Sequence, residues 1–216
     1  VRRLAGATTS GLHRSTWDLR LPAPNPIELE EPGFKEPWMS DPKGPLVAPG
    51  TYSVQIVRVD TTGSTLLTEP QQFFVKPTPA VAARPDLAES SVFNHQVWQL
   101  LHAVLHAAKQ LGETRKRVKE QRVELAISPT STAEHLAALE ARHVVVEELA
   151  LLLLGDPNRE RLHEAQSLSI KGLTERIAAH LWETTQAPTT AQREMMARAS
   201  AKFEAYIVAF AALDFG

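Results

Sequence analysis

Cysteine is absent from this chain of 216 residues. Its absence excludes disulfide bonds, thiolate nucleophiles and zinc sites built on thiolates, and it is compatible with either a reducing or an oxidising compartment. A strong charge of either sign is missing too, because the formal net charge is -2 and the isoelectric point is near 6.5. No global field therefore draws the chain to nucleic acid or to anionic lipid, and we expect neither as a partner.

Long apolar runs are also missing. The richest run, Val144 to Leu154, is interrupted by Glu147 and Glu148, whereas a membrane span needs about 18 uninterrupted apolar residues. We expect no transmembrane segment in this chain, which leaves docking onto a membrane complex open. A signal peptide is absent and the chain opens at Val1, so we expect a fragment or processed product of a longer protein.

Sequence motifs of catalysis are missing as well. The chain holds no glycine-rich phosphate loop, no Gly-x-Ser-x-Gly elbow and no His-Glu-x-x-His pair. Three carboxylates, Glu28, Glu30 and Glu31, lie in a proline-rich segment that cannot by itself hold two acids at the separation that glycosidic cleavage requires. We therefore expect a protein that is not an enzyme, with no catalytic residue, cofactor or metal site.

The front of the chain has the period-2 pattern of β-strands. Residues 11–20 alternate around Trp17, the turn pair Pro49-Gly50 opens a strand over Thr51–Val59, and a return strand follows over Thr65–Val75. With a short strand end at Val1–Leu4, about four strands are expected, fewer than the roughly seven of a complete immunoglobulin-like sandwich. The prediction for residues 1–80 is thus an incomplete immunoglobulin-like (Ig-like) β-sandwich, with the missing strands upstream of Val1.

Residues 21–49 interrupt this pattern as an extended, irregular insertion. Proline lacks the N–H that a sheet ladder needs, and it recurs here at Pro22, Pro24, Pro26, Pro32, Pro37, Pro42, Pro45 and Pro49. The insertion also holds the candidate partner-binding residues Phe34, Trp38 and Met39. These side chains pack either on their own sandwich or on a protein partner or upstream domain. In the second case, replacing Trp38 and Phe34 by alanine should weaken assembly without unfolding.

From residue 85 onward the period changes to that of helices, which predicts an antiparallel four-helix bundle over residues 85–216. The first helix should end near Ile127, the second should start at a Ser131/Glu134 capping box and stop at Gly155, the third should run from about Leu162 or Ser167 to Thr185, and the fourth should start at Thr189 or Thr190. The residues expected to face inward are Phe93, Val97, Leu100, Val104, Ala108, Leu111, Val118, Leu125, Leu136, Leu139, Val146, Leu149, Leu153, Ile170, Leu173, Ile177, Leu181, Met196, Ala199, Phe203, Tyr206, Phe210 and Leu213.

Two polar groups in the first helix have both a functional and a structural interpretation. His95, His102 and His106 share one helical stripe, and the last two have the spacing of a two-histidine metal half-site, but one ion cannot also reach His95, roughly 10 Å further along the axis. We expect solvated or interface histidines. A basic run from Arg115 to Arg122 alternates with glutamates, which is typical of a salt-bridged, solvated face rather than of an anion site.

The residues Arg3-Leu4, Gly11-Leu12-His13-Arg14, Trp17-Asp18-Leu19-Arg20 and Pro49-Gly50-Thr51-Tyr52-Ser53-Val54 support a resemblance. Together with the helical tail, they resemble the C-terminal region of bacterial sortilin-like, BNR-repeat proteins of the glycosyl-hydrolase type. The resemblance implies a periplasmic or extracellular location and an upstream β-propeller, although no Asp-box of a propeller blade occurs here.

Two functional hypotheses follow from these observations. The first is a non-catalytic structural or interaction module, the accessory C-terminal part or a subunit of a larger exported, envelope-associated assembly. The alternative is the supporting domain of a sortilin-like BNR-propeller that binds or cleaves glycans. Acidic and aromatic residues converging in one cleft would favour the alternative. A buried Trp17 with an exposed Trp38 and an apolar patch on the bundle would favour the first hypothesis, which we expect.

Overall fold

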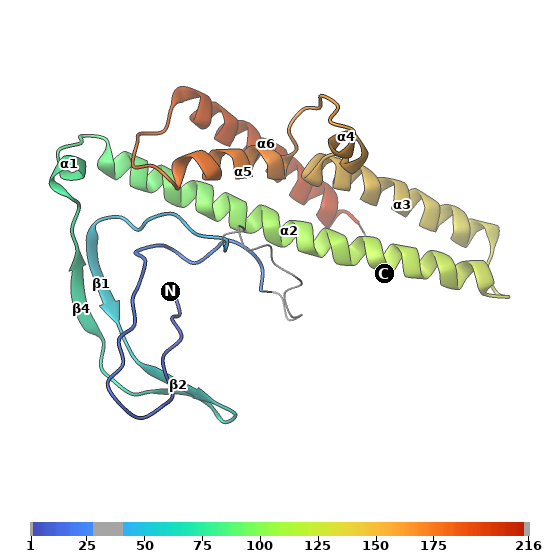
Figure 1. The fold of residues 1–216 in the computed structure, drawn as a ribbon. Coiled ribbons are helices and arrows are strands. Elements are labelled where there is room, and N and C mark those ends of the chain that lie inside the picture. The colour runs from blue at the N-terminus through green and yellow to red at the C-terminus, as the bar shows by residue number, and fades with distance from the viewer. Residues whose placement is uncertain (1, 28–40, 214–216) are drawn as a thin grey trace.

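The computed structural model describes residues 2–27 and 41–213, and it shows a mixed α+β protein. In Figure 1, a β-ribbon and the N-terminal chain hang from one end of a long helical body. The strands are β1 (Gly50–Val54), β2 (Val57–Asp60), β3 (Gly63–Leu66) and β4 (Gln71–Val75). The helices are α1 (Pro79–Ala82), α2 (Leu87–Ile127), α3 (Ala133–Leu154), α4 (Pro157–Arg161), α5 (Ile170–Leu181) and α6 (Thr190–Ala211).

The four strands form one long hairpin, called here the β-ribbon (residues 50–75). β1 pairs with β4 and β2 pairs with β3, both antiparallel, and the chain reverses at Gly63, whose φ is 133°. The two predicted strands are confirmed in place, but each is broken in two. At the break the amide N–H of Ile56 donates to the Thr68 hydroxyl, at 3.0 Å, rather than to a ladder carbonyl, and Pro70 has no N–H to offer.

The strand predicted over residues 11–20 is wrong. Leu19 has a φ of 56°, which interrupts an extended path, and Arg20 forms only an isolated bridge to Leu46. The residues described in the first predicted strand, 2–4, are not in a strand either. The tryptophan anchor itself is present, because the Trp17 ring lies edge-on to Tyr52 and Phe73, with centroids 5.6 and 6.0 Å away. A sandwich is therefore not confirmed in the described part of the chain.

The helices begin and end close to the predicted residues because local capping signals set them. The capping box at the start of α6 is present in full, since Thr189 and Gln192 bond each other's backbone N–H groups. At α3 the cap is one residue later than predicted: the Thr132 side chain, not Ser131, accepts the N–H of His135 at 3.2 Å. The α5 helix starts at Ile170 with Ser169 as its cap, slightly after Ser167, the later of the two predicted starts.

The arrangement of the helices differs from the expected up-down bundle. α3 lies along the C-terminal half of α2 and α5 along its N-terminal half, both antiparallel to α2, while α6 packs over α5 and α3 (Figure 1). α5 continues in the direction of α3 because Gly155, at φ 91°, and Pro157 end the helix and the connection carries α4 before α5 begins. Each cross-section thus contains about three helices, and a four-helix bundle is not confirmed.

The core runs along α2 as two clusters of buried side chains. One cluster joins α2 to α3, α5 and α6 and includes Leu111, Val146, Leu153 and Tyr206. The other joins the start of α2 to α5 and includes Phe93, Val97, Ile177 and Trp182. Most residues predicted to face inward lie in or against these clusters, whereas Leu136 is 44% exposed, so its prediction is wrong.

Candidate functional site

A short piece of the proline-rich insertion forms a strap against the helices. We call residues 20–27 the strap. Its root is paired with a second piece of the insertion, because the N–H of Leu21 donates to the Pro45 carbonyl at 2.9 Å and the N–H of Val47 donates to the Leu19 carbonyl at 2.8 Å. Gly44 is needed for this close approach, since a Cβ there would lie 2.4 Å from the Leu21 carbonyl oxygen.

Arginine side chains fasten the root of the strap. The Arg20 guanidinium donates to the carbonyls of Gly44 and Trp182, each at 3.0 Å, and so joins the insertion to the end of α5. Arg2 donates to the carbonyls of Arg20 and Leu21 at 3.1 and 3.0 Å, and it forms an ion pair with Asp18. These hydrogen bonds give a donor to backbone carbonyls that are not paired within a β-sheet.

Beyond its root, the strap follows α2. The Trp98 indole N–H donates to the Pro22 carbonyl at 2.9 Å, and the Lys109 ammonium donates to the Ile27 carbonyl at 2.8 Å. The rise from residue 98 to residue 109 of a helix is about 16 Å, close to the roughly 17 Å that five extended residues span at most. Because the strap bends at Pro24 and Asn25, it spans less than this maximum. The long Lys109 side chain covers the remaining distance to the Ile27 carbonyl. The Pro24 side of the strap is buried.

A ladder of rings lies on the same face of α2. Ring centroids are 5.7 Å apart for His95 and Trp98, 5.4 Å for Trp98 and His102, and 4.2 Å for His102 and His106. We call these four residues the ring ladder. His102 and His106 follow Trp98 and precede Lys109 along α2. His102 is half-buried, whereas His95 and His106 are exposed, as expected of solvated histidines. Burial and the neighbouring charge of His106 lower the pKa of His102.

A groove of about 560 Å³ opens beside the ring ladder, between the insertion, β1 and the start of α2. Its polar groups are the imidazole of His95, the amides of Gln96 and Gln99 and the hydroxyls of Tyr52 and Ser91, and the rest of the lining is apolar. A second groove of about 460 Å³ lies between the far ends of α2 and α3. Among the residues that line these two grooves, Glu124 is the only carboxylate, so neither pairs acids as glycosidic cleavage requires.

Some of the predicted site residues lie within the described part of the chain and others lie outside it. Phe34, Trp38 and Met39, together with Glu28, Glu30 and Glu31, lie outside the described residues. His102 and His106 are adjacent, but residues 2–27 and 41–213 contain no group of three or more potential ligands suited to a metal ion. The pair His102 and His106, whose spacing alone would suit a two-histidine half-site, thus has no third protein ligand in the described chain.

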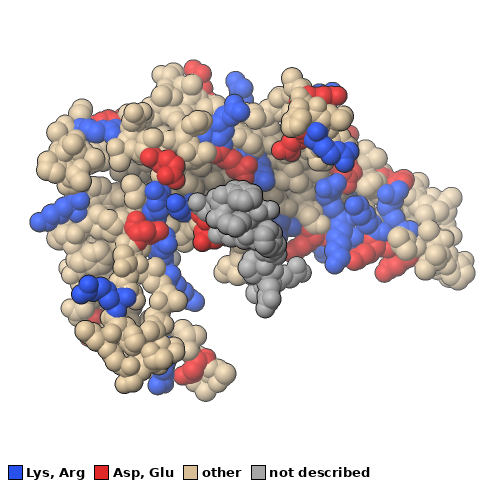
Figure 2. All heavy atoms as spheres, in the orientation of Figure 1, with Lys and Arg blue, Asp and Glu red and all other residues tan. Residues whose placement is uncertain are grey.

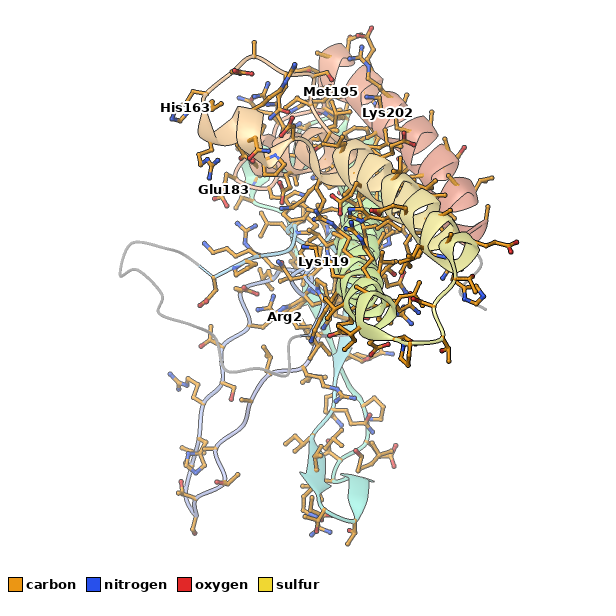
Figure 3. The ribbon with its side chains drawn as sticks, turned by 90° about the vertical axis from the view of Figure 1, so that its right-hand side faces the viewer. Arg2, Lys119, His163, Glu183, Met195 and Lys202 are labelled. Carbon is orange, nitrogen blue, oxygen red and sulfur yellow. The ribbon has the colours of Figure 1, made fainter. Side chains whose placement is uncertain are left out.

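The basic run forms salt bridges as expected, but its two shortest pairs go to glutamates of α3 rather than to the glutamates within the run, of which Glu120 pairs with Lys116 at 3.9 Å. Arg115 binds Glu147 with two hydrogen bonds of 2.9 and 2.6 Å, and Arg122 binds Glu140 at 2.6 Å. The Arg115 guanidinium lowers the pKa of the Glu147 carboxyl. Figure 2 shows blue and red side chains mixed where α2 and α3 lie side by side, and Lys119 is labelled on α2 in Figure 3. Paired charges of this kind hold two helices in register.

Sequence reasoning missed the surface of the β-ribbon. An Ig-like sandwich would have buried one face of it, yet the ribbon projects away from the helices (Figures 1 and 3). Tyr52, Phe73 and Val75 are partly buried, but seven other apolar side chains of the ribbon are exposed by 43 to 70%: Val54, Ile56, Val57, Val59, Leu66, Leu67 and Phe74. The outer edges of β1 and β4 pair with no other strand among residues 2–27 and 41–213. The alternation of apolar residues in the sequence indicates that one face of these strands is apolar, but it does not indicate which surface covers that face.

No protein-family model, no curated protein and no solved structure matches this chain. The resemblance to sortilin-like proteins therefore stays a prediction. In the described part of the chain, no helix has the length and apolarity needed to cross a membrane.

Proposed function

We propose that this chain is a non-catalytic structural or interaction module whose β-ribbon binds a protein partner. The observation that carries the proposal is the exposed apolar surface of the ribbon, which includes Val59, 68% exposed, and Phe74, 70% exposed. Apolar surface that gathers on one element and stays exposed to water typically marks a binding site for protein.

The chemistry of the ribbon selects the kind of partner. A two-stranded hairpin is only marginally stable in water, and its outer edges offer rows of unpaired N–H and C=O groups. An extended segment that adds a strand to either edge would pair these groups and would bury the apolar side chains. The donor of this strand is a separate protein or another domain of the same parent polypeptide. Such an addition would extend the ribbon toward the Ig-like sandwich predicted from the sequence.

The resemblance to sortilin-like proteins supports two further parts of this proposal. It favours a periplasmic or extracellular location, and it favours a role as accessory part or subunit of an envelope-associated assembly. The only carboxylate in the two grooves is Glu124, so we place the glycan-acting alternative second.

The test combines site-specific crosslinking with matched variants. A photoreactive residue is placed at position 74 or 59 of the full chain in its native source, and at the equally exposed Val208 of α6 as a control. We expect one protein to crosslink from both ribbon positions and not from position 208. The double change Leu66→Ser, Phe74→Ser should remove this partner without changing the circular dichroism spectrum. Equal crosslinking from all three positions, or an unaffected complex, would refute the proposal.

A further inference from the structure

We propose that the ring ladder on α2 is a recognition site for extended, proline-rich peptide segments, which the strap occupies within this chain. The site comprises His95, Trp98, His102 and His106, with Lys109 at its far end. A proline-rich segment of another protein is the ligand that this chemistry fits once the strap is displaced. This site is separate from the β-ribbon.

The strap has the properties of such a ligand. Pro22, Pro24 and Pro26 alternate with Ala23 and Asn25, and each proline fixes φ near −65° and restricts the residue before it. A segment whose backbone is restricted in this way loses little conformational entropy on binding. Because proline has no N–H, the backbone offers mainly carbonyl acceptors, which need donors from the surface that binds it.

The α2 face supplies complementary groups. Two side-chain donors meet carbonyls at the two ends of the segment, Trp98 at Pro22 and Lys109 at Ile27. Between them, the adjacent rings of Trp98, His102 and His106, tilted to one another by 33° and 32°, form a preordered aromatic surface. Proline-binding grooves are in general lined by aromatic rings, and a tryptophan N–H with one wet and one apolar side suits this role. Recognition would depend on the prolines and backbone carbonyls of the ligand rather than on its other side chains.

The contacts also show how the segment can exchange. Residues 20 and 21 are fastened by Arg2, by the Pro45 carbonyl and, through the Arg20 side chain, by Gly44 and Trp182. Within the described chain, residues 22–27 are joined to α2 by the two hydrogen bonds from Trp98 and Lys109. The root can therefore stay in place while the proline-rich part leaves. The strap then acts as an internal competitor of any ligand from outside.

The experiment uses the full chain and a labelled peptide with the sequence of residues 20–27, Arg-Leu-Pro-Ala-Pro-Asn-Pro-Ile. The strap is loosened by Pro24→Gly, Pro26→Gly, which leaves the ring ladder intact. If the strap occupies the site nine-tenths of the time, the loosened variant should bind the peptide about tenfold more tightly than the natural chain, by fluorescence anisotropy. Adding Trp98→Phe should reverse most of this gain, because one hydrogen bond to the ligand is lost.

Controls separate recognition from a purely structural strap. A peptide with glycine in place of all three prolines should bind at least about tenfold more weakly. Where the glycine variant fails to give a native circular dichroism spectrum, Lys109→Met loosens the far end of the strap instead. No binding by a folded, loosened variant at about 1 mM peptide, or binding that ignores Trp98→Phe, would overturn the proposal.

Discussion

Arg20 joins three parts of the molecule that are far apart in sequence. Its guanidinium donates to Gly44 in the insertion and to Trp182 at the end of α5, and its own carbonyl accepts from Trp17 and Arg2. Arginine suits this position because its planar fork keeps several donors in fixed directions and its charge is permanent. The part of the β-ribbon formed by β1 and β4 is thereby tied to the helices through Trp17, which packs on Tyr52.

Tyr206 is a fully buried residue whose hydroxyl has no hydrogen-bond partner among the described residues. Burial raises its pKa to about 12. Because this hydroxyl makes no hydrogen bond, its removal breaks none and relieves the cost of burying a polar group. Tyr206→Phe should therefore leave the free energy of unfolding unchanged or raise it by about 1 kcal/mol. The matched control is Tyr52→Phe, since the Tyr52 hydroxyl donates to the Ala48 carbonyl at 2.6 Å. Urea denaturation checks both; a clearly destabilised Tyr206→Phe would contradict the prediction.

His102 should make stability depend on pH. Its pKa is lowered by burial and by His106, so the folded chain binds fewer protons at this site than the unfolded chain. The free energy of unfolding should therefore fall as the pH drops below about 6.5, the unfolded pKa of histidine. Within the strap, residues 21–27 carry no titratable side chain that could offset this effect.

The measurement is urea denaturation between about pH 7.5 and pH 5.5, the range in which histidine titrates. His102→Gln should flatten this dependence, whereas the same change at the exposed His163 should not. An identical slope in His102→Gln and the natural chain would rule out His102 as the source.

α3 is the element whose sequence says least about its orientation. Apolar residues surround it on all sides: Val146, Leu149 and Leu153 are buried, while Val144, Val145, Leu151 and Leu152 are exposed. A helix with a strong apolar stripe, such as α5, can be oriented from its period alone. In α3 the packing of α2, α5 and α6 on one side decides which apolar residues are inside.

The two faces of α3 should respond differently to truncation. Leu153 is fully buried in the core, so Leu153→Ala should lower the free energy of unfolding by about 2 to 5 kcal/mol through lost contacts and a cavity. Leu151, 52% exposed, is the matched control, and Leu151→Ala should cost less than about 1 kcal/mol. Chemical denaturation compares the two. Equal losses would mean that the outer face is also covered in solution.

The molecule as a whole is a long helical body with a thin ribbon at one end (Figure 1). Buried side chains concentrate along α2, from Phe93 to Val118, whereas all eight residues of β2 and β3 are exposed. Stability is therefore unevenly distributed, because local opening costs least where few apolar contacts are lost.

Hydrogen exchange should show this distribution. In the isolated chain we expect the slowest amides in α2 between residues 97 and 118, intermediate exchange in β1 and β4, where Trp17 packs, and the fastest exchange of paired strands in β2 and β3. Mass spectrometry of exchanged peptides resolves these segments. A ribbon as well protected as α2 without any partner would show that something in the isolated protein already covers it.

The sequence by itself determined the four longer helices and the two arms of the β-ribbon, because their signals are local, whereas it wrongly predicted strands over residues 2–4 and 11–20 and missed the short helices α1 and α4. The period of apolar residues placed the helices, capping residues such as Thr189 marked their starts, and Pro49-Gly50 preceded a real strand. Trp17 was recognisable as an anchor. Only the tertiary structure decided how these elements meet: that α5 follows the direction of α3, that the strands form a ribbon with no second sheet over it among the described residues, and that Pro22 meets Trp98. Such contacts join residues distant in the chain, and no local pattern records which of several apolar or hydrogen-bonding surfaces will come together.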